Sequence, residues 1–511
     1  MARINTNVSS LVAQTNLARS NNELQTRLQR LSTGLRINRG ADDPAGLITS
    51  ERLRTELRGL EQGIKNAERA SSVISTTEGS LSEVSELLNS IKALTVEAAN
   101  TGGISREEVQ ANQLQIDSAI ESISRIANTA SFAGLKLLNG SLGYNLSGVV
   151  SADIAKSRVF GAQLIDRATV DVDIEVIGSA QNAGLFLRGV GSVGSAVVSS
   201  VTLEVTGPDG VVELTFQSGT TFDNVIAAIN SRSIITGIAA QRVTAGDITS
   251  GIRFYSNAYG SDAFVSVRRV TGGTTMQIGR IDNNAAPPIV WSGGGANVAI
   301  ADRDTGKDVV ALVNGAVAIG RGLELSVRGS ELDMDLLLTP TFATTVNPAN
   351  ATSFVITGGG AKFQLGPQVT PLQQTNIGID SLSATRIGGT LVTLASGATQ
   401  LQFLSSLKSG GTNELASRNF SAASRILETS IDEVSQIRGR LGAFERNILQ
   451  TNVRSLQSGV ENITASDSVI RDADFAKETS YLTRAQVLQS AGTSVLAAAN
   501  TSAQSVLQLL G

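Results

Sequence analysis

The sequence contains no cysteine and no histidine among its 511 residues. Without cysteine the chain forms no disulfide, offers no thiolate nucleophile and lacks ligands of the commonest zinc sites. Without histidine it also lacks the side chain most often used as a general base and as a ligand of transition metals. These absences exclude most catalytic triads and most transition-metal sites, so that only carboxylate, lysine or hydroxyl chemistry remains.

The chain also lacks a large net charge of either sign. The 41 Lys and Arg residues and 45 Asp and Glu residues give a formal net charge of -4, and they are spread along the chain. Binding to nucleic acid or to an acidic membrane surface needs a concentrated basic field. We therefore expect neither nucleic acid nor a membrane surface as a partner.

Long hydrophobic runs are absent from both ends. In the first thirty residues Asn and Ser interrupt every apolar run, so no signal-peptide core is present there. The last stretch, QVLQSAGTSVLAAANTSAQSVLQLLG (486–511), contains no charged residue, but Gln, Ser, Thr and Asn recur through it. A membrane span needs about 20 mostly apolar residues, so we expect no membrane insertion.

The N-terminal region has the apolar periodicity of long helices. Asp43 and Pro44 predict a helix start, and Ser105 with Glu108 has the spacing of a capping box. Apolar residues three or four positions apart predict one helix face before position 40 and coiled-coil-like stripes after it. The early positions are Ile4, Val8, Leu11, Leu17, Leu24, Leu28, Leu31 and Leu35; the later ones include Leu53, Leu57, Leu60, Ile64, Leu81, Val84, Leu88, Ile91, Ile116, Ile120 and Ile123.

The C-terminal region has the same character. One stripe includes Leu427, Ile431, Val434, Leu441 and Ile448, and after a shift in register Val453, Leu456, Val460 and Ile463 continue it. Asp472 or Asp474 is expected to cap the last helix. The last helix repeats Leu488, Ala491, Val495, Ala499, Ser502, Val506 and Leu509 at spacings of three or four residues.

Between about residues 165 and 365 the texture changes to short, alternating or β-branched runs separated by glycine, such as VDVDIEVIG and SSVTLEVTGPDG. One amphipathic helix, TFDNVIAAIN (221–230), interrupts them. Each helical end exposes an apolar stripe that needs a partner. The sequence therefore predicts a mixed α and β fold, in which long N- and C-terminal helices pair as an antiparallel coiled-coil-like core around a β-rich insertion.

The final helix is not expected to be stable by itself. Full burial of a large apolar side chain contributes about 1.5–3 kcal/mol, and small Ala and Ser positions contribute less. Fixing the backbone costs about 1–2 kcal/mol per residue, partly offset by helix hydrogen bonds. Its other faces carry Ala, Ser, Thr, Gln and Asn instead of charge. We expect many copies of the same chain to cover it, although its periodicity is equally that of a helix in an ordinary bundle core.

GVGSVG (189–194) has the spacing of a dinucleotide-binding loop, with Asp209 about twenty residues further on. Such a loop should open a helix, but the following AVVSSVTLEV has the pattern of a strand and Asp209 lies in a Pro-Asp-Gly turn. We interpret GVGSVG as a glycine-rich loop between strands.

Two further motifs have structural explanations. Asp42 with Asp43, and Asp472 with Asp474, are pairs that helix capping explains without a catalytic or metal pocket. GGGAKFQLG (358–366) lacks the Gly-Lys-Ser/Thr ending of a phosphate loop and is interpreted as a turn. We therefore expect no catalytic, cofactor-binding or metal site, and no enzyme activity.

Several segments together resemble bacterial flagellins at both ends of the chain. About 140 residues at the front and nearly 100 at the back take part, and TFDNVIAAIN lies in a segment (212–270) that resembles a small motif of flagellin and hook-associated insertions. The matching segments are LSTGLRIN (31–38), ADDPAGL (41–47), ISTTEGSL (74–81), LTVEAAN (94–100), ANTASFAGLKLLNG (127–140), IRGRLGAFERNILQ (437–450), SVIRDADFAKE (468–478) and RAQVLQSAGTSVLAAAN (484–500).

The resemblance implies a filament subunit that is exported unfolded through the flagellar secretion channel and polymerises outside the cell beneath a cap. It implies an inner helical assembly domain of residues 1–40 with 470–511, and a helical shell domain of residues 41–165 with 375–469. Residues 166–374 would be the outer β-rich insertion. The absence of cysteine fits passage as an unfolded thread, and the absence of histidine excludes the HExxH zinc protease that some flagellins carry.

The assembly residues that follow from this interpretation are Ile4, Val8, Leu11, Leu28, Leu31, Leu35, Leu488, Ala491, Val495, Val506 and Leu509. The expected partners are many copies of the chain, with the export machinery and its chaperone, hook-associated proteins and the filament cap by resemblance. Two alternatives stay open: a hook-filament junction protein of related architecture, and an adhesin or enzyme displayed on the insertion.

Overall fold

The computed structural model describes residues 6–163, 169–188, 196–244, 246, 250–272, 276–281, 298–329, 331–346, 351–393 and 399–510. The chain forms two compact units. The first, here called the terminal unit, contains Met1–Arg69, Gln364–Gln373 and Ile448–Gly511. The second, the central unit, contains Ala70–Phe363 and Gln374–Asn447. Residues far apart in the sequence thus form each unit.

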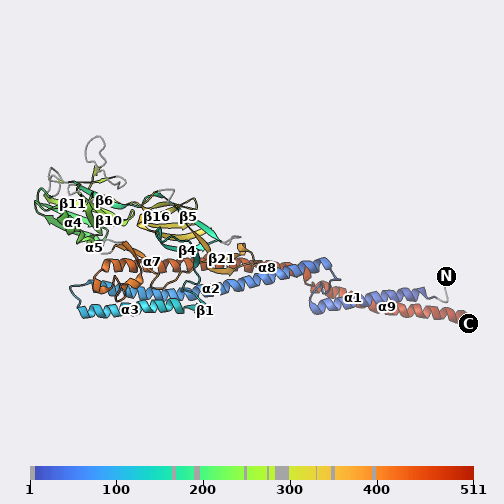
Figure 1. Cartoon of the computed structure of the whole chain (residues 1–511). Helices are drawn as coiled ribbons and strands as arrows, with labels where there is room; N and C mark the ends of the chain where they lie inside the picture. Colours follow the sequence, from blue (N-terminus) through green and yellow to red (C-terminus); the bar gives the residue numbers. More distant parts are fainter. Residues whose placement is uncertain are drawn as a thin grey trace. The chain divides into compact units, whose positions relative to one another are not determined.

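The terminal unit is built from long helices. They are α1 (Val8–Thr33), the first part of α2 (Pro44–Ala99), α8 (Gln450–Arg471) and α9 (Phe475–Leu510). α1 and α9 lie side by side (Figure 1). Backbone hydrogen bonds also join the segment that connects α1 to α2 with the segment that connects α8 to α9. The N–H of Arg36 donates to the carbonyl of Arg471 at 2.7 Å. The predicted antiparallel pairing of the two chain ends is confirmed.

The predicted helix starts are confirmed by their hydrogen bonds. The N–H of Gly46 donates to Asp43 Oδ1 at 2.9 Å, and Ser105 and Glu108 form a complete capping box. At α9 the cap is Asp474, whose Oδ1 accepts from the N–H of Lys477 at 3.1 Å. α2 continues through Gly79, since the missing side chain faces open space there and removes no packing.

In the central unit, buried apolar stripes lie on the second part of α2, α3 (Arg106–Thr129) and α7 (Phe420–Phe444). Because each fully buried Leu or Ile contributes about 1.5–3 kcal/mol, these stripes stabilise the three helices. A π-helical turn, Glu445–Leu449, follows α7. The most deeply buried positions include Ile74, Leu81, Val84, Leu88, Ile91, Ile116, Ile120, Ile123, Ala127, Ile426, Leu427, Val434 and Leu441.

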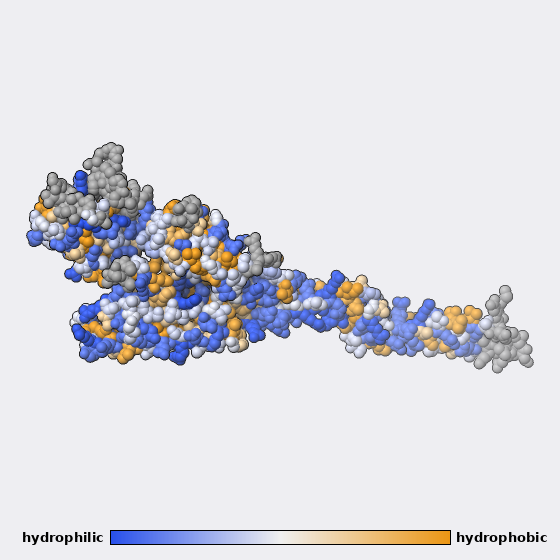
Figure 2. Space-filling model, viewed as in Figure 1, coloured by the Kyte–Doolittle hydropathy of each residue, from blue (hydrophilic) through white to orange (hydrophobic). Residues whose placement is uncertain are grey.

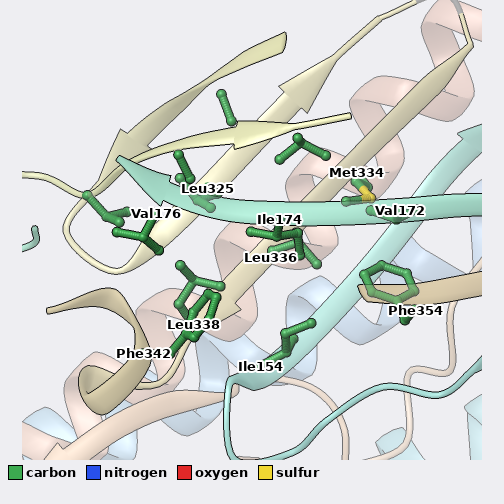
Figure 3. Close-up of a cluster of buried hydrophobic side chains, with 14 of the residues drawn as sticks. Ile154, Val172, Ile174, Val176, Leu325, Met334, Leu336, Leu338, Phe342 and Phe354 are labelled. Atoms are coloured by element: carbon green, nitrogen blue, oxygen red, sulfur yellow. The ribbon is translucent and has the colours of Figure 1, made fainter. Parts of the chain in front are cut away.

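The β-rich middle contains an eight-stranded antiparallel sheet in the order β3-β19-β5-β15-β16-β17-β18-β4. Its inner face carries a hydrophobic core that includes Val172, Ile174, Met334, Leu336 and Phe354 (Figure 3). The strands are β3 (Tyr144–Ser147), β4 (Ile154–Ala162), β5 (Val170–Gly178), β15 (Val310–Val313), β16 (Ala316–Arg321), β17 (Glu324–Arg328), β18 (Leu332–Leu338) and β19 (Thr352–Gly359).

A second hydrophobic core lies between a five-stranded sheet, β13-β12-β6-β10-β9, and a four-stranded sheet, β14-β11-β7-β8. The predicted helix is α4 (Phe222–Asn230), and its Phe222, Val225 and Ile229 are buried in this core. The strands are β6 (Asn182–Arg188), β7 (Val201–Gly207), β8 (Gly210–Phe216), β9 (Ile238–Arg242), β10 (Ile252–Tyr259), β11 (Phe264–Gly272), β12 (Gln277–Ile281), β13 (Val298–Ile300) and β14 (Arg303–Thr305).

Shorter elements complete the described chain. They are β1 (Ser131–Phe132) with β2 (Leu135–Lys136), β20 (Ala361–Gln364) with β21 (Gln374–Ile377), β22 (Thr390–Thr393) with β23 (Thr399–Gln402), the one-turn helices α5 (Ser233–Thr236) and α6 (Pro340–Ala343), and the 3-10 helices η3 (Pro371–Gln373), η4 (Leu404–Leu407) and η5 (Leu415–Ser417). Gly360, at a φ of 78°, makes the predicted turn of the GGGAKFQLG motif between β19 and β20. Asp209 lies in the turn between β7 and β8, as predicted, whereas GVGSVG (189–194) falls outside the described residues.

Candidate assembly surface

The contact between α1 and α9 uses small residues, which let the two helices approach closely. Ser10, Ala13 and Ala485 are buried in it. A Cβ added to Gly492 would lie 3.3 Å from Leu17 Cδ1. At the far end Ser10 Oγ donates to Asn500 Oδ1 at 2.8 Å. A narrow, well-fitted seam therefore joins the first and last helices of the chain.

An ion pair fixes the register at the other end of this seam. Glu478 is only 6% exposed, and its two carboxylate oxygens accept from Arg27 Nη1 at 3.1 and 3.0 Å. Arg30 Nη1 lies 3.4 Å from Oε1 of the same residue. The Arg27 guanidinium also stacks on the Tyr481 ring, 4.6 Å from its centroid. Since a partly buried carboxylate needs its cations, sliding α9 along α1 is costly.

The outward faces of α1 and α9 carry large apolar side chains that nothing in the described chain covers. Phe475, the first residue of α9, is 69% exposed, and the exposed fractions of the others lie between 43% and 64%. Figure 2 shows orange surface along these paired helices. Beyond Arg484, no charged residue interrupts α9. We call these residues, Phe475 apart, the outer apolar set: Val8, Leu11, Val12, Leu28, Val487, Leu488 and Val495.

The predicted assembly residues differ in their exposure. Val8, Leu11, Leu28, Leu488, Ala491 and Val495 are exposed, whereas Leu31 and Leu35 are half-buried. Ile4 lies outside the described residues, as do the side chains of Val506 and Leu509. Of the described side chains in the C-terminal stripe recognised in the sequence, Leu488, Ala491, Val495 and Ser502 are therefore on an open face, and only Ala499 lies in the contact with α1.

Sequence reasoning missed the true seam on α9. The covered positions are Ala485, Gln489, Gly492, Leu496 and Ala499, which also repeat every three or four residues. Leu496 apart, these residues are small or polar, and an apolar-periodicity search weights Leu and Val above Gly, Ala and Gln. The small residues at 485, 492 and 499 were the available signal, since close helix packing favours them.

A cluster of charged side chains lies in the central unit around a cavity of about 360 Å³. Lys156 Nζ lies 2.5 Å from Glu433 Oε1, and Arg158 Nη2 lies 3.4 Å from Asp335 Oδ2. Burial lowers the pKa of the Lys156 ammonium, against the attraction of Glu433. Each of these carboxylates is held by a cation, so the arrangement is that of an ion-pair network joining β4 and β18 to α7.

Asp380 is a separate case next to this network. Its Oδ2 is buried without a hydrogen-bond partner in the described part of the chain. Burial raises the pKa of this carboxyl from 3.8 to about 6, although Arg158 and Lys156 oppose the shift. The folded state therefore holds this proton more tightly than the unfolded state does. Stability from Asp380 is present at low pH and is lost as the pH rises from about 4 to about 6.

Replacing Asp380 with Asn should stabilise the central unit at pH 7.5. At about 1.4 kcal/mol per pH unit, the gain is about 2–3 kcal/mol, because the neutral amide avoids the cost of a buried charge. At pH 4 the variant and the natural protein should melt together. Thermal unfolding followed by circular dichroism at both pH values checks this. The control is Asp262→Asn, whose carboxylate pairs with Arg321 at the surface and should change little. A variant less stable than the natural protein at pH 7.5 would contradict the prediction.

Within the described ranges, no group of three or more His, Cys, Asp or Glu residues is arranged to hold a metal ion. Among the described helices, none is both long enough and apolar enough to span a membrane.

Known proteins resemble this chain along its length. Residues 4–142 match the bacterial flagellin N-terminal helical region, and residues 425–510 match the bacterial flagellin C-terminal helical region. The flagellin of Salmonella typhimurium (strain LT2) is 29% identical over 540 residues, with 99% of both chains covered. Flagellin B of Vibrio anguillarum is 26% identical over 508 residues, again with 99% of both chains covered.

Among solved structures, flagellar hook associated protein-3 from Legionella pneumophila is 10% identical. It covers 81% of this chain and 97% of its own, with a TM-score of 0.30. The D1-D2-D3 domains of the flagellar cap protein FliD from Escherichia coli are 14% identical and cover 64% of this chain and 96% of their own, with a TM-score of 0.28.

Proposed function

This chain belongs to the bacterial flagellin family, and from that premise we infer that it is a structural subunit which polymerises into the flagellar filament used for swimming. The family is structural, and its filaments are extracellular. We propose that this chain works in the same way, by assembly, and catalyses no reaction.

The observation that supports this inference most directly is the outer apolar set on α1 and α9. Soluble monomers seldom leave several large aliphatic side chains open along one helix pair, and such surfaces usually contact another protein. With Phe475 at the start of α9, the seven residues of the set make eight large apolar positions on the two helices with exposed fractions above 40%. When the surface that covers them belongs to a different face of an identical chain, the contact repeats without closing and produces an open helical polymer.

The division of labour along the chain follows as a proposal. Residues 1–40 with 470–511 would form the inner assembly domain, in which Val8, Leu11, Leu28, Leu488, Ala491 and Val495 contact other copies. Ile4, Leu31, Leu35, Val506 and Leu509 are proposed to take part in the same contacts. Residues 41–165 with 375–469 would form the surrounding helical shell, and residues 166–374 the outer part.

Other partners are proposed from the family. The flagellar export machinery and a chaperone would bind the chain before assembly. Hook-associated proteins and the filament cap would lie at the ends of the polymer. A chain without cysteine is suited to export as an unfolded thread, because no disulfide can close a loop before passage.

A test of this function replaces Leu488 and Val495 together with Asp. Both side chains are exposed in the single chain, so the monomer should keep its helix content by circular dichroism. In a polymer the two carboxylates would be buried without cations, at a cost of several kcal/mol. Seeded polymerisation followed by negative-stain microscopy should show no filaments, or a critical concentration at least about 1,000-fold higher.

The matched control introduces the same chemistry elsewhere. Val317 and Ile319 on β16 are also exposed aliphatic residues, and replacing both with Asp should leave polymerisation unchanged, since the insertion is proposed to lie outside the helical core. Normal filaments from the Leu488 and Val495 variant would refute the role of this face.

A further inference from the structure

The most exposed large apolar side chains among the described residues lie in neither terminal helix. Val369 and Leu372 are each 85% exposed. Both belong to the segment between β20 and β21, here called the 365–373 loop, which contains a single 3-10 turn at Pro371–Gln373. This loop is part of the terminal unit. No role for these two residues follows from the packing of the chain itself.

The loop holds its own shape through hydrogen bonds. The N–H of Leu365 donates to the carbonyl of Gln373 at 2.9 Å, and the N–H of Gln368 donates to Gln373 Oε1 at 2.6 Å. Gln364 Nε2 donates to the carbonyls of Gly366 at 2.9 Å and Gln368 at 2.6 Å. These hydrogen bonds close the loop and restrict the backbone around Val369.

The base of the loop is seated on α2 and α8. Asn452 Nδ2 on α8 donates to the carbonyl of Leu365 at 3.0 Å. On α2, a Cβ added to Gly59 would lie 2.7 Å from Pro367 Cβ, and one added to Gly63 would lie 2.9 Å from the Leu365 carbonyl. Glycine at these two helix positions lets the loop backbone touch the helix. Glycine destabilises the interior of a helix, so its presence at both positions indicates that the sequence of α2 is adapted to holding this loop.

The chemistry of the loop selects an apolar partner. From Phe363 to Ile379 the chain has no charged residue, so the loop itself offers no counter-charge to an ionic ligand or to nucleic acid. Two aliphatic side chains also bury far less than the roughly 1,200 Å² of a stable protein pair. The loop can therefore hold a partner only where other contacts already keep it close, which raises its effective concentration. A polymer of identical chains supplies that condition.

We propose that Val369 and Leu372 form an apolar knob that packs against a neighbouring copy of this chain in the polymer. The proposal rests on the inferred filament function. Ile48 on α2 and Val469 on α8 are further open apolar residues of the same unit, away from the loop, with exposed fractions of 59% and 80%, so a neighbouring copy has surface of matching character to offer. Preorganisation of the loop limits the entropy lost on contact.

The absence of cysteine makes a direct test possible. In Leu372→Cys the single thiol should react with a maleimide rapidly in the monomer and at least tenfold more slowly in filaments. In Ile300→Cys, a control at a position 78% exposed on β13, the rate should be the same in both states. If wild-type protein forms no filaments, the filament function fails. If filaments form and the thiol of the Leu372→Cys variant stays fully reactive in them, the knob alone is refuted.

A second measurement identifies what covers the loop. Labelling the thiol of the Leu372→Cys variant with a benzophenone maleimide and irradiating filaments should give covalent chain dimers, and irradiating monomers should give none. Exclusively intrachain products from filaments would overturn the proposal. The polar variant Val369→Ser with Leu372→Ser should fold normally and raise the critical concentration at least tenfold, whereas an unchanged critical concentration would count against the knob.

Discussion

A chain that ends at Thr483 is expected to form no filaments under conditions in which the full-length protein forms long ones. The truncation removes Ala485, Gly492 and the rest of the seam on α9, so Ser10, Ala13 and Leu17 on α1 lose their cover. It also removes Val487, Leu488 and Val495, three members of the outer apolar set. Intrachain pairing and contacts between copies are thus lost together, which makes this the largest effect we expect from any change.

Negative-stain microscopy of both proteins after addition of short filament seeds checks this prediction. The central unit ends at Asn447, so the truncation leaves it whole and it should keep its unfolding transition. A normal transition of the central unit distinguishes failed assembly from general misfolding. Hydrogen exchange on the full-length monomer reports whether α9 is ordered before assembly. Rapid exchange of its amides would agree with an end that becomes ordered on assembly. Filaments from the truncated chain, or a full-length protein that stays monomeric with a protected terminus, would contradict the argument and favour a junction or displayed-adhesin role.

Replacing Glu478 with Ala should destabilise the terminal unit by about 3–5 kcal/mol, the usual cost of breaking a buried ion pair from one side. Arg27 and Arg30, whose side chains are 18% and 19% exposed, would be left largely buried without the carboxylate that pairs them. Denaturant unfolding of the filaments, in which α9 is ordered, should show an earlier loss of helix by circular dichroism, and the critical concentration for polymerisation should rise.

The matched control is Glu23→Ala, because Glu23 Oε1 pairs with the same Arg27 at 3.5 Å from an exposed position. Exposed pairs of this kind contribute about 0.3–0.5 kcal/mol, so the control should hardly change the transition. Equal effects of the two substitutions would show that burial of Glu478 has no special role in joining α1 to α9. A normal transition for Glu478→Ala would show the same.

Local sequence patterns predicted much of the fold. The starts of α2, α3 and α9 follow from the capping residues Asp43, Ser105 and Asp474, since capping depends on neighbours three residues away. The turn at Asp209 and the buried face of α4 follow for the same local reason. Strand order could not be predicted, because β3 pairs with β19 and β4 with β18, and each pair joins strands that lie far apart in the sequence.

The network around Glu433 was also outside the reach of the sequence. Lys156 and Arg158 lie on β4, whereas their partners Glu433 and Asp335 lie on α7 and β18, and the spacing of these residues along the chain carries no motif. Ion pairs of this type depend on which elements meet in the folded protein. The same holds for the 365–373 loop, where the exposure of Val369 and Leu372 depends on the seat that Gly59 and Gly63 provide.

The sequence by itself determined that both ends are helices, that the middle is β-rich, and that the chain has neither thiol nor imidazole chemistry. These properties depend on composition and on periodicity within one element. Only the tertiary structure decided which face of α9 is used within the chain. Gly492 and Ala485 pack on α1 because small side chains allow close approach, and this leaves Leu488 and Val495 on the open side. A single apolar stripe cannot reveal that choice, because helix packing depends on shape as well as hydrophobicity.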